Sequence, residues 1–282
     1  SSAARSFNNA AHRLHGELKM MQPEVNFGWD PGQYTKFLSE RTRPAIELLS
    51  RLPAELSVKE AVDLGCGPGN SSAVVYSRFP AAKIAGIDSS PAMIQEAGQK
   101  YPYLHFAVAS IDQYESPEPV DLIFSNAALH WVSEHEKLLP RLMNSLRKGG
   151  TLAVQMPNNH MEITHTTMRE IATDFTWSKD LSAIRSTPPV LEPEQYYDML
   201  IPLSASVDIW QTKYFHVMND AGAIGQWLCG TGLRPFLDAL PEGEAAKFLE
   251  LYVKRIAQHL KPRKDGKILM PFPRLFIVAI KN

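Results

Sequence analysis

Residues 61–72, AVDLGCGPGNSS, place a carboxylate and a glycine-rich loop directly after a short apolar run. Gly65, Gly67 and Gly69 alternate with other residues, and Asp63 precedes the first of them by two positions. A glycine-rich loop after a buried strand lets the backbone approach a ligand closely. The pattern therefore predicts a nucleotide-type ligand, either a dinucleotide with its pyrophosphate or a phosphate-free nucleoside such as S-adenosylmethionine.

Three details bear on the choice between these ligands. The spacing G-x-G-x-G differs from the G-x-G-x-x-G loop that holds a pyrophosphate at a helix N-terminus. Asp63 is predicted to end its strand, where a carboxylate repels phosphates but suits the ammonium group of a methionine moiety. Asp88 ends the segment KIAGID, nineteen residues after Gly69, and can accept hydrogen bonds from both hydroxyls of a ribose in either ligand. Together the spacing and Asp63 favour S-adenosylmethionine.

Each of these residues also has a purely structural interpretation. Glycines at a strand–helix turn can serve only to allow positive φ angles, and Asp63 alone could cap a helix. The combination of the loop with two acids at strand ends favours a ligand over that interpretation.

The surrounding sequence alternates between strand and helix patterns. Strands are predicted at KEAVDL, KIAGID, LHFAVA, VDLIFSN and GTLAVQM, and helices at NSSAVVYSRF and SSPAMIQEAGQKY. A further helix is predicted from Asp30-Pro31 to about Arg51, and another from the S-x-x-E box of Ser133 and Glu136 to about Arg147. This alternation predicts an α/β fold with a doubly wound, mostly parallel sheet, which binds ligands at the carboxyl ends of its strands.

The pattern changes after Met156. Residues 160–201 are predicted to be mostly helical around the break STPPVLEPE, and residues 219–265 to be helical with proline and glycine breaks. SASVDIWQTKYFHV and PRLFIVAIKN are predicted strands, so we expect a helical cap inserted between the last strands, over the carboxyl edge of the sheet. The expected division is an N-terminal extension (1–28), a core (29–158), a helical connection that contributes to the cap (159–204), a core strand (205–218), the cap (219–265) and a final core strand (266–282).

Composition and charge limit the classes of partner. The net charge of -1 gives no electrostatic reason to expect nucleic acid or an anionic membrane, and no run approaches the roughly 18 apolar residues of a membrane span. Cys66 and Cys229 are too few for a disulfide framework or a thiolate zinc site. We expect a cytoplasmic protein, monomeric or weakly homo-oligomeric, without a metal. Residues 1–28 are expected to be a flexible extension, with a mitochondrial transit segment as the alternative.

Several segments resemble the class I S-adenosylmethionine-dependent methyltransferases: VDLGCGPGNSS, GIDSSPAMI, DLIFSNAALHW, GGTLAVQMPNN and FPRLFIVA. Others are similar to the trans-aconitate 2-methyltransferases within that class, namely WDPGQYTKF…ERTRPAIELL, VDIWQTKYFHVM and TGLRPFL. The resemblance runs from Trp29 to about Ala279. It implies the seven-stranded methyltransferase sheet, S-adenosylmethionine as cofactor, and formation of a methyl ester on trans-aconitate, a small carboxylic acid.

The resemblance and the loop pattern together give the residues expected to bind the cofactor. They are Tyr34, Arg41, Asp63, Gly65, Cys66, Gly67, Asn70, Asp88, Ser89, Met93, Ser110, Ile111 and Asn126. Enzymes of this class usually place an acid after the third strand to hold the adenine amino group. Here that position is Ser110, and Asp112 follows two residues later, so either residue can fill the role.

The acceptor determines which further residues are needed. A carboxylate, with a pKa near ~4, is ionised at neutral pH and requires no general base, so catalysis would come mainly from proximity and orientation. Its anionic groups require cationic or hydrogen-bonding partners. The residues expected to bind the acceptor are Trp29, Phe37, Trp131, Arg234 and Arg274, although Arg274 could instead be a structural charge within an apolar strand.

Other functions remain as alternatives. The first is an O-methyltransferase for a hydroxyl or phenol of a specialised metabolite, with His130 as the base. A non-catalytic cofactor-binding module and a nicotinamide dehydrogenase are the others. The segment SNAALHW differs from the [D/N]-P-P-[Y/F] of enzymes that methylate exocyclic amino groups of bases, which counts against a nucleic-acid substrate.

Overall fold

A computed structural model describes residues 40–184 and 190–282, which divide into two compact units. Of the described residues, the first unit holds 40–156, Leu191–Trp210 and Phe276–Asn282. The second unit holds 157–184, Val190 and Gln211–Leu275. The predicted extension (1–28), the start of the helix predicted from Asp30, and the predicted site residues Trp29, Tyr34 and Phe37 all lie outside the described residues.

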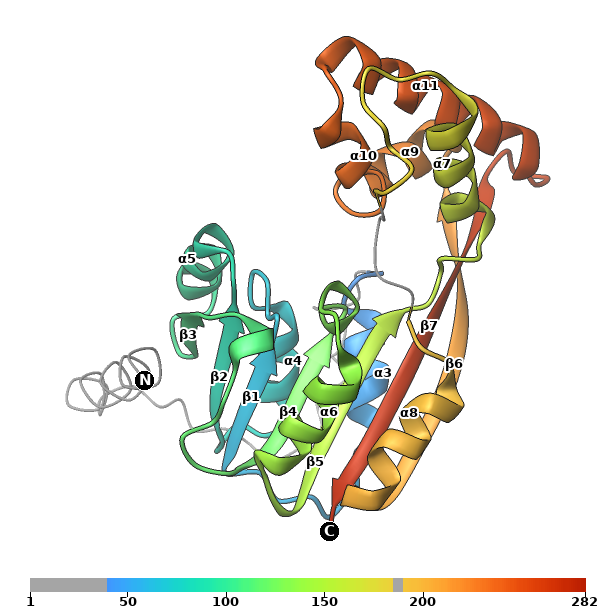
Figure 1. The fold of residues 1–282 in the computed structure, drawn as a ribbon. Coiled ribbons are helices and arrows are strands. Elements are labelled where there is room, and N and C mark those ends of the chain that lie inside the picture. The colour runs from blue at the N-terminus through green and yellow to red at the C-terminus, as the bar shows by residue number, and fades with distance from the viewer. Residues whose placement is uncertain (1–39, 185–189) are drawn as a thin grey trace. The chain divides into compact units, whose positions relative to one another are not determined.

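The strands form one seven-stranded sheet in the order β3-β2-β1-β4-β5-β7-β6 (Figure 1). Their bounds are β1 Glu60–Leu64, β2 Lys83–Asp88, β3 His105–Val108, β4 Val120–Asn126, β5 Leu146–Pro157, β6 Ser204–Met218 and β7 Ile268–Lys281. β1 pairs in parallel with β2 and β4, β2 with β3, and β4 with β5. β7 points opposite to β4 and β5 in Figure 1. It is also antiparallel to β6, since Asn282 N at its end donates to Leu203 O beside the start of β6. The sheet is mixed and mostly parallel, as predicted.

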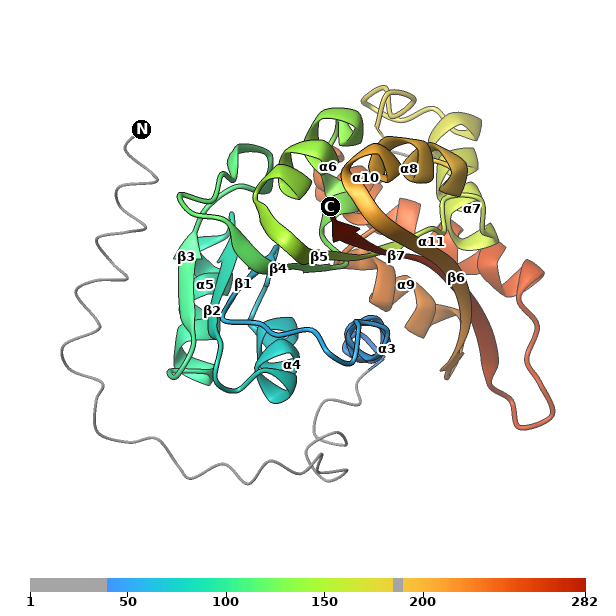
Figure 2. The ribbon, with the colours of Figure 1, turned by 90° about the horizontal axis from the view of Figure 1, so that it is seen from below.

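Helices cover both faces of the sheet in the first unit, which is the doubly wound arrangement predicted. α3 (Arg43–Ser50) and α4 (Asn70–Arg78) lie on one face, and α6 (His135–Asn144) and α8 (Pro193–Leu200) on the other (Figure 2). α5 (Pro91–Lys100) connects β2 to β3, and short 3-10 turns occur at η1 (Ile111–Gln113), η2 (Leu129–Trp131) and η3 (Ile201–Leu203). α5 begins as its sequence predicts, because the Ser90 hydroxyl accepts a hydrogen bond from Met93 N and Pro91 occupies the first turn.

The start and end of α6 differ from the prediction. Its first residue is His135, and the residue before it, Glu134, has a left-handed φ of 58°. The Ser133 box is therefore wrong, because the backbone turns sharply at Glu134 and no side chain caps the helix there. The helix also ends at Asn144 rather than near Arg147, because Leu146 already pairs with Val120 at the start of β5.

The second unit is helical apart from the outer parts of β6 and β7. Its helices are α7 (Ile163–Asp174), α9 (Ala221–Cys229), α10 (Arg234–Ala239) and α11 (Glu242–His259), and α11 packs against the other three. Phe236, Phe248 and Tyr252 are fully buried at their centre. The Tyr252 hydroxyl donates to Thr164 O at 2.9 Å, which ties α11 to α7. The unit therefore has a core of its own.

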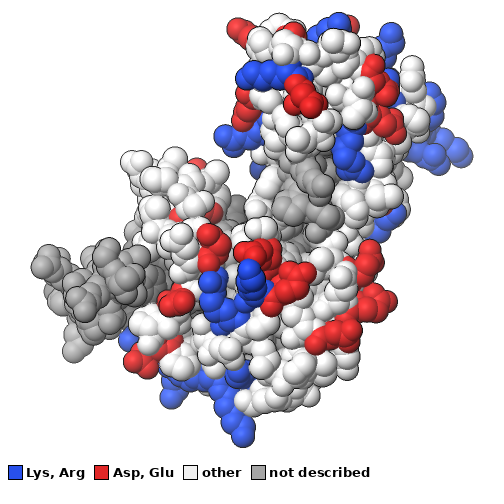
Figure 3. Space-filling model, viewed as in Figure 1, with Lys and Arg blue, Asp and Glu red and all other residues white. Residues whose placement is uncertain are grey.

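The face of the molecule drawn in Figure 3 carries no single dominant charge. Basic and acidic side chains lie side by side over the face shown in Figure 3. No helix in the described part of the chain is both long and apolar enough to cross a bilayer. Within the same residues, no cluster of three or more His, Cys, Asp or Glu side chains has the arrangement of a metal site.

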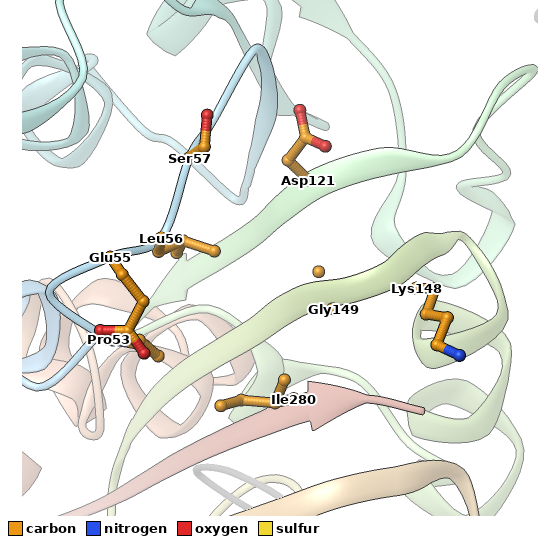
Figure 4. A pocket seen from close by; sticks show the side chains of 9 residues that line it. Pro53, Glu55, Leu56, Ser57, Asp121, Lys148, Gly149 and Ile280 are labelled. Carbon is orange, nitrogen blue, oxygen red and sulfur yellow. The ribbon is translucent and has the colours of Figure 1, made fainter.

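A cavity of about 240 Å³ lies where β4 and β5 begin, at the amino edge of the sheet (Figure 4). Asp121 lines it, and its carboxylate accepts hydrogen bonds from Lys59 N (2.8 Å), Glu60 N (3.0 Å) and Arg147 (2.9 Å). These bonds join the starts of β1 and β4. The acids and glycines singled out by the sequence lie at the opposite, carboxyl edge.

Candidate functional site

The glycine loop, residues 65–69, leaves the end of β1 and leads directly into α4. Gly65, Gly67 and Gly69 have φ angles of 71°, 52° and 90°, in the left-handed region that side chains disfavour. Gly65 N and Cys66 N donate to the same acceptor, Ile87 O, at 2.8 and 2.9 Å. The loop is thereby fixed to the end of β2.

Two glycines of this loop serve different purposes. A Cβ at Gly65 would lie 2.2 Å from the Cβ of Ala128, so a side chain cannot fit between the loop and the turn after β4. A Cβ at Gly67 would meet no described atom within 4 Å. Gly65 is thus required for packing, whereas the open space beside Gly67 leaves room for a ligand to approach the backbone.

Asp63 is fully buried at the end of β1. Its Oδ2 accepts hydrogen bonds from the hydroxyls of Ser71 (2.6 Å) and Ser72 (2.7 Å), both on α4. Its Oδ1 has no hydrogen-bond partner among the described residues. Burial raises the pKa of Asp63 to about 6, with the serine hydroxyls opposing that rise and the Asp88 charge adding to it. A cationic ligand group near Oδ1 would offset the cost of this buried charge.

Asp88, at the end of β2, organises the neighbouring backbone. Its Oδ2 accepts from Gly67 N at 3.0 Å, and its Oδ1 accepts from Ser90 N at 2.9 Å. Each carboxylate oxygen can accept a second hydrogen bond. Asp88 can therefore hold the loop and still receive two ribose hydroxyls.

The residues predicted to lie near the adenine follow β3. The Ser110 hydroxyl donates to Asp112 Oδ1. The two residues that could bind the adenine amino group are therefore in direct contact with each other. Ile111 is buried between them, with its Cδ1 3.2 Å from the position of a Cβ at Gly65. Asn126 ends β4, and its Oδ1 has no hydrogen-bond partner in the part of the chain that is described.

Other predicted cofactor residues are less directly placed. The Asn70 side chain accepts from Lys100 Nζ (2.7 Å) and Tyr101 Oη (3.0 Å), which commits it to the contact between α4 and α5. Cys66 is buried, and burial raises the pKa of its thiol above the ordinary value. Arg41, Ser89 and Met93 are exposed.

The predicted acceptor residues fall in both units. In the first, the His130 and Trp131 rings of η2 lie 4.9 Å apart, with His130 buried and Trp131 47% exposed. In the second, Arg234 is exposed and pairs with Asp238 at 3.3 Å.

Arg274 is only 4% exposed within β7. Its guanidinium lies 4.5 Å from the centre of the Phe272 ring and 5.9 Å from that of Tyr214. Cation–π contacts of this kind stabilise a buried guanidinium.

Sequence reasoning missed the turn that follows β4. Ala127 has a left-handed φ of 54°, and Ala128 packs against Gly65. The signal available was the run of two small residues directly after the strand, which is compatible with close packing. Nothing in the local sequence indicates the contact between His135 on α6 and Tyr196 on α8, 61 residues apart.

Comparison with known proteins identifies a domain in the first unit. Residues 61–150 match the family described as a methyltransferase domain. This match contains the glycine loop, Asp88 and the strands up to the start of β5. The fold and this family match together define a methyltransferase, with S-adenosylmethionine as its cofactor.

Curated relatives cover almost the whole chain. The chain is 48% identical over 256 residues to a trans-aconitate 2-methyltransferase of Methylobacterium radiotolerans, a match that covers 90% of this chain and 98% of the relative. It is 48% identical over 253 residues to that of Klebsiella pneumoniae, with 90% and 98% coverage, and 46% identical over 253 residues to that of Azoarcus sp., with 90% and 99% coverage. The chain belongs to the family of trans-aconitate 2-methyltransferases, which confirms the resemblance drawn from its sequence. These relatives are bacterial and give no support to a mitochondrial address.

Solved structures are similar to this fold at low sequence identity. A YcgJ protein of Bacillus subtilis has a TM-score of 0.56 at 13% identity, and the match covers 85% of this chain and 99% of that one. A methyltransferase of Bacillus halodurans described as putative has a TM-score of 0.55 at 12% identity, with 85% and 99% coverage. These similarities establish the fold alone.

The buried Asp63 carboxylate predicts how stability changes with pH. Its pKa of about 6, against an ordinary 3.8, means that the folded protein binds this proton more tightly than the unfolded chain does. The contribution therefore favours folding at low pH and is lost as pH rises through about 6, at a cost of about 3 kcal/mol. Asp63→Asn removes that cost. We expect the stability of Asp63→Asn relative to wild type to rise between about pH 4 and pH 7.5 in urea unfolding.

Asp121→Asn provides a control of opposite sign. Burial acts to raise the pKa of Asp121, but hydrogen bonds from Glu60 N, Arg147 and Lys59 N lower it overall. Asp121 therefore stabilises the folded state at neutral pH, and Asp121→Asn should lose relative stability as pH rises. A pH-independent difference for Asp63→Asn would show that the pKa of Asp63 is the same in the folded protein as in the unfolded chain.

Proposed function

We propose that this protein transfers the methyl group of S-adenosylmethionine to a carboxylate of trans-aconitate, or of a closely related small polycarboxylic acid, and forms a methyl ester. The observation that supports this cofactor is the glycine loop at the carboxyl edge of the sheet, where Asp88 accepts from Gly67 N and the buried Asp63 accepts from Ser71 at the start of α4. The acceptor is supported by relatives named trans-aconitate 2-methyltransferase, 46–48% identical over nine tenths of the chain.

The residues around the loop have distinct proposed roles toward the cofactor. The backbone at Gly67 borders it, Asp88 accepts its ribose hydroxyls, and the unpaired Oδ1 of Asp63 faces its ammonium group directly or through water. Ser110 or Asp112 reads the adenine. The other proposed contacts are Tyr34, Arg41, Gly65, Cys66, Asn70, Ser89, Met93, Ile111 and Asn126.

The proposed reaction requires no general base. When bound, S-adenosylmethionine supplies an electrophilic methyl group on a positively charged sulfur. A carboxylate oxygen forms the new C–O bond as the C–S bond breaks, and the two opposite charges cancel without movement of a proton. The protein therefore contributes by binding and orienting the acceptor and by excluding water.

For the acceptor we propose Trp29, Phe37, Trp131, Arg234 and Arg274 as binding residues. The proposal for the two arginines rests on the match between guanidinium and carboxylate geometry. We also propose that residues 219–265, with part of 159–204, act as a cap that contributes Arg234. We propose that the protein acts as a monomer or a weak homo-oligomer. Its proposed partner is a small molecule and not a nucleic acid or a membrane.

The proposal predicts the outcome of an acceptor panel. Transfer of labelled methyl from S-adenosylmethionine would be measured with trans-aconitate, cis-aconitate, citrate, isopropylmalate and, as a hydroxyl control, catechol. We expect trans-aconitate to be preferred and its product to be base-labile, as an ester is. Transfer to catechol instead would favour the hydroxyl alternative with His130 as base. Cofactor binding without product from any acid would reject the proposed acceptor.

Asp88→Ala should weaken binding of S-adenosylmethionine by about 1.5–3 kcal/mol, because charge-assisted hydrogen bonds to the ribose are lost. Asp63→Ala should weaken it by a comparable amount. Titration calorimetry measures both, with Asp208→Ala, an exposed acid on β6, as the matched control. Unchanged affinity in both variants would refute the site as assigned.

Arg274→Met should raise the KM for trans-aconitate about tenfold or more while leaving cofactor affinity nearly unchanged, because an arginine–carboxylate pair is lost and the apolar packing is kept. Steady-state kinetics and calorimetry measure the two effects separately. A variant that unfolds, or one with unaltered KM, would identify Arg274 as a structural charge held by Phe272 and Tyr214.

A further inference from the structure

The turn between β4 and α6, residues 127–134, is conformationally strained at both ends. Ala127 and Glu134 have φ angles of 54° and 58°, in a region that non-glycine residues rarely adopt. Such conformations persist only where surrounding contacts fix them. Between these residues lies η2, which carries His130 and Trp131. The contacts that fix this turn therefore bear on the acceptor side of the proposed site.

A chain of buried hydrogen bonds reaches the turn from α8. His135, at the start of α6, is 7% exposed. Its Nε2 lies 2.9 Å from Leu129 O and its Nδ1 lies 2.7 Å from Tyr196 Oη. A carbonyl oxygen only accepts, so a neutral imidazole carries its proton on Nε2 and accepts the Tyr196 hydroxyl proton at Nδ1. The Tyr196 oxygen in turn accepts from Leu191 N at 3.3 Å.

Packing around these hydrogen bonds holds their donors and acceptors in fixed positions. Tyr196 is fully buried, and α6 and α8 pack against each other on one face of the sheet (Figure 2). Burial also raises the pKa of the Tyr196 phenol above its ordinary value, which keeps its proton available for donation. A buried donor or acceptor that loses its partner is costly to the folded state, so each member holds the next in place.

The chain ends beside the cofactor loop. Leu129, whose carbonyl His135 holds, is fully buried and directly follows Ala128. Ala128 is the residue whose Cβ occupies the space denied to a side chain at Gly65. The fixed position of Leu129 therefore determines how Ala128 packs against the glycine loop. It also determines the direction in which η2 runs from that contact.

We infer that His135 and Tyr196 are positioning residues for methyl transfer, which hold the turn of residues 127–131 against the glycine loop and so fix the acceptor side relative to the cofactor. The inference rests on the proposed function. Neither residue touches a reactant in this role, because His135 acts through the Leu129 carbonyl and Tyr196 acts through His135.

Three substitutions test the chain at separate links. Tyr196→Phe removes the hydroxyl and keeps the ring. His135→Gln keeps an amide N–H that can reach Leu129 O in place of Nε2, whereas His135→Asn is too short and keeps only the position of Nδ1. Tyr197→Phe removes the hydroxyl of a tyrosine on the same helix that is 45% exposed, and it serves as the matched control. The two His135 variants introduce the same neutral amide at different reaches. His135→Gln keeps the bond to Leu129 O and loses the one to Tyr196 Oη, and His135→Asn does the reverse, so their comparison ranks the two bonds.

Two measurements on the full-length protein decide the inference. Hydrogen exchange of the segment 127–132 reports whether the turn is held, through amides such as Trp131 N and Val132 N that bond within it. Steady-state transfer to trans-aconitate and calorimetry of S-adenosylmethionine report the effect on function. For Tyr196→Phe and His135→Asn we expect faster exchange and a kcat/KM lowered about tenfold, with a cofactor Kd within about twofold of wild type. Tyr197→Phe should stay near wild type. His135→Gln should lie between Tyr197→Phe and His135→Asn, because it keeps the direct bond to Leu129 O but loses the bond to Tyr196 Oη.

Other outcomes overturn the inference. Unchanged exchange in Tyr196→Phe and His135→Asn would show that the chain does not hold the turn, and faster exchange with unchanged kcat/KM would show that the turn does not position the acceptor. If Tyr196→Phe does not fold, the exchange rates and kcat/KM values of His135→Gln and His135→Asn are compared instead. Equal values in these two variants would show that the bond to Leu129 O does not hold the turn. If the wild type transfers no methyl to trans-aconitate, the proposed function fails, and the exchange measurement still decides whether the chain holds the turn.

Discussion

The close approach of Gly65 to Ala128 is the constraint on which the site depends. β1 and β4 are parallel neighbours, so the chain that leaves β1 must turn in the space left by the chain that leaves β4. A residue without a Cβ and with a left-handed φ satisfies both requirements. Because the chain turns so tightly, α4 begins at once, and its first turn brings Ser71 and Ser72 onto the carboxylate of Asp63.

The same tight turn explains why this loop suits a phosphate-free ligand. Its N–H groups are used within the protein, since those of Gly65 and Cys66 bond to Ile87 O and that of Gly67 bonds to Asp88. A pyrophosphate loop needs such groups directed at the ligand. Here two carboxylates lie at the ends of β1 and β2, and the charge of Asp88 adds to the cost of ionising the buried Asp63. A ligand that carries an ammonium and a sulfonium group lowers that cost, whereas one that carries phosphates increases it.

Local pattern predicted the elements of the first unit well, because each strand and its following helix are specified by neighbouring residues. β2 spans Lys83–Asp88, the six residues of KIAGID. Prediction failed at Ser133, because Glu134 precedes the helix with a left-handed φ of 58° that capping preference does not specify. In the site, the glycines and Asp88 were readable because their spacing along the chain is their signal. The partners of Asn70 were not, since they come from another helix.

A reaction that moves no proton changes what an active site must contain. Activation of a hydroxyl requires a base whose pKa is tuned by its surroundings, but an ionised carboxylate needs only to be held in line with the methyl group. At the carboxyl edge the strongly perturbed acid is Asp63, for which we propose a role toward the cofactor and not toward the acceptor. The turn that carries His130 and Trp131 is distinguished instead by strained backbone at Ala127 and Glu134. Strain of this kind is retained where position matters, which is the requirement that a carboxylate acceptor leaves to the protein.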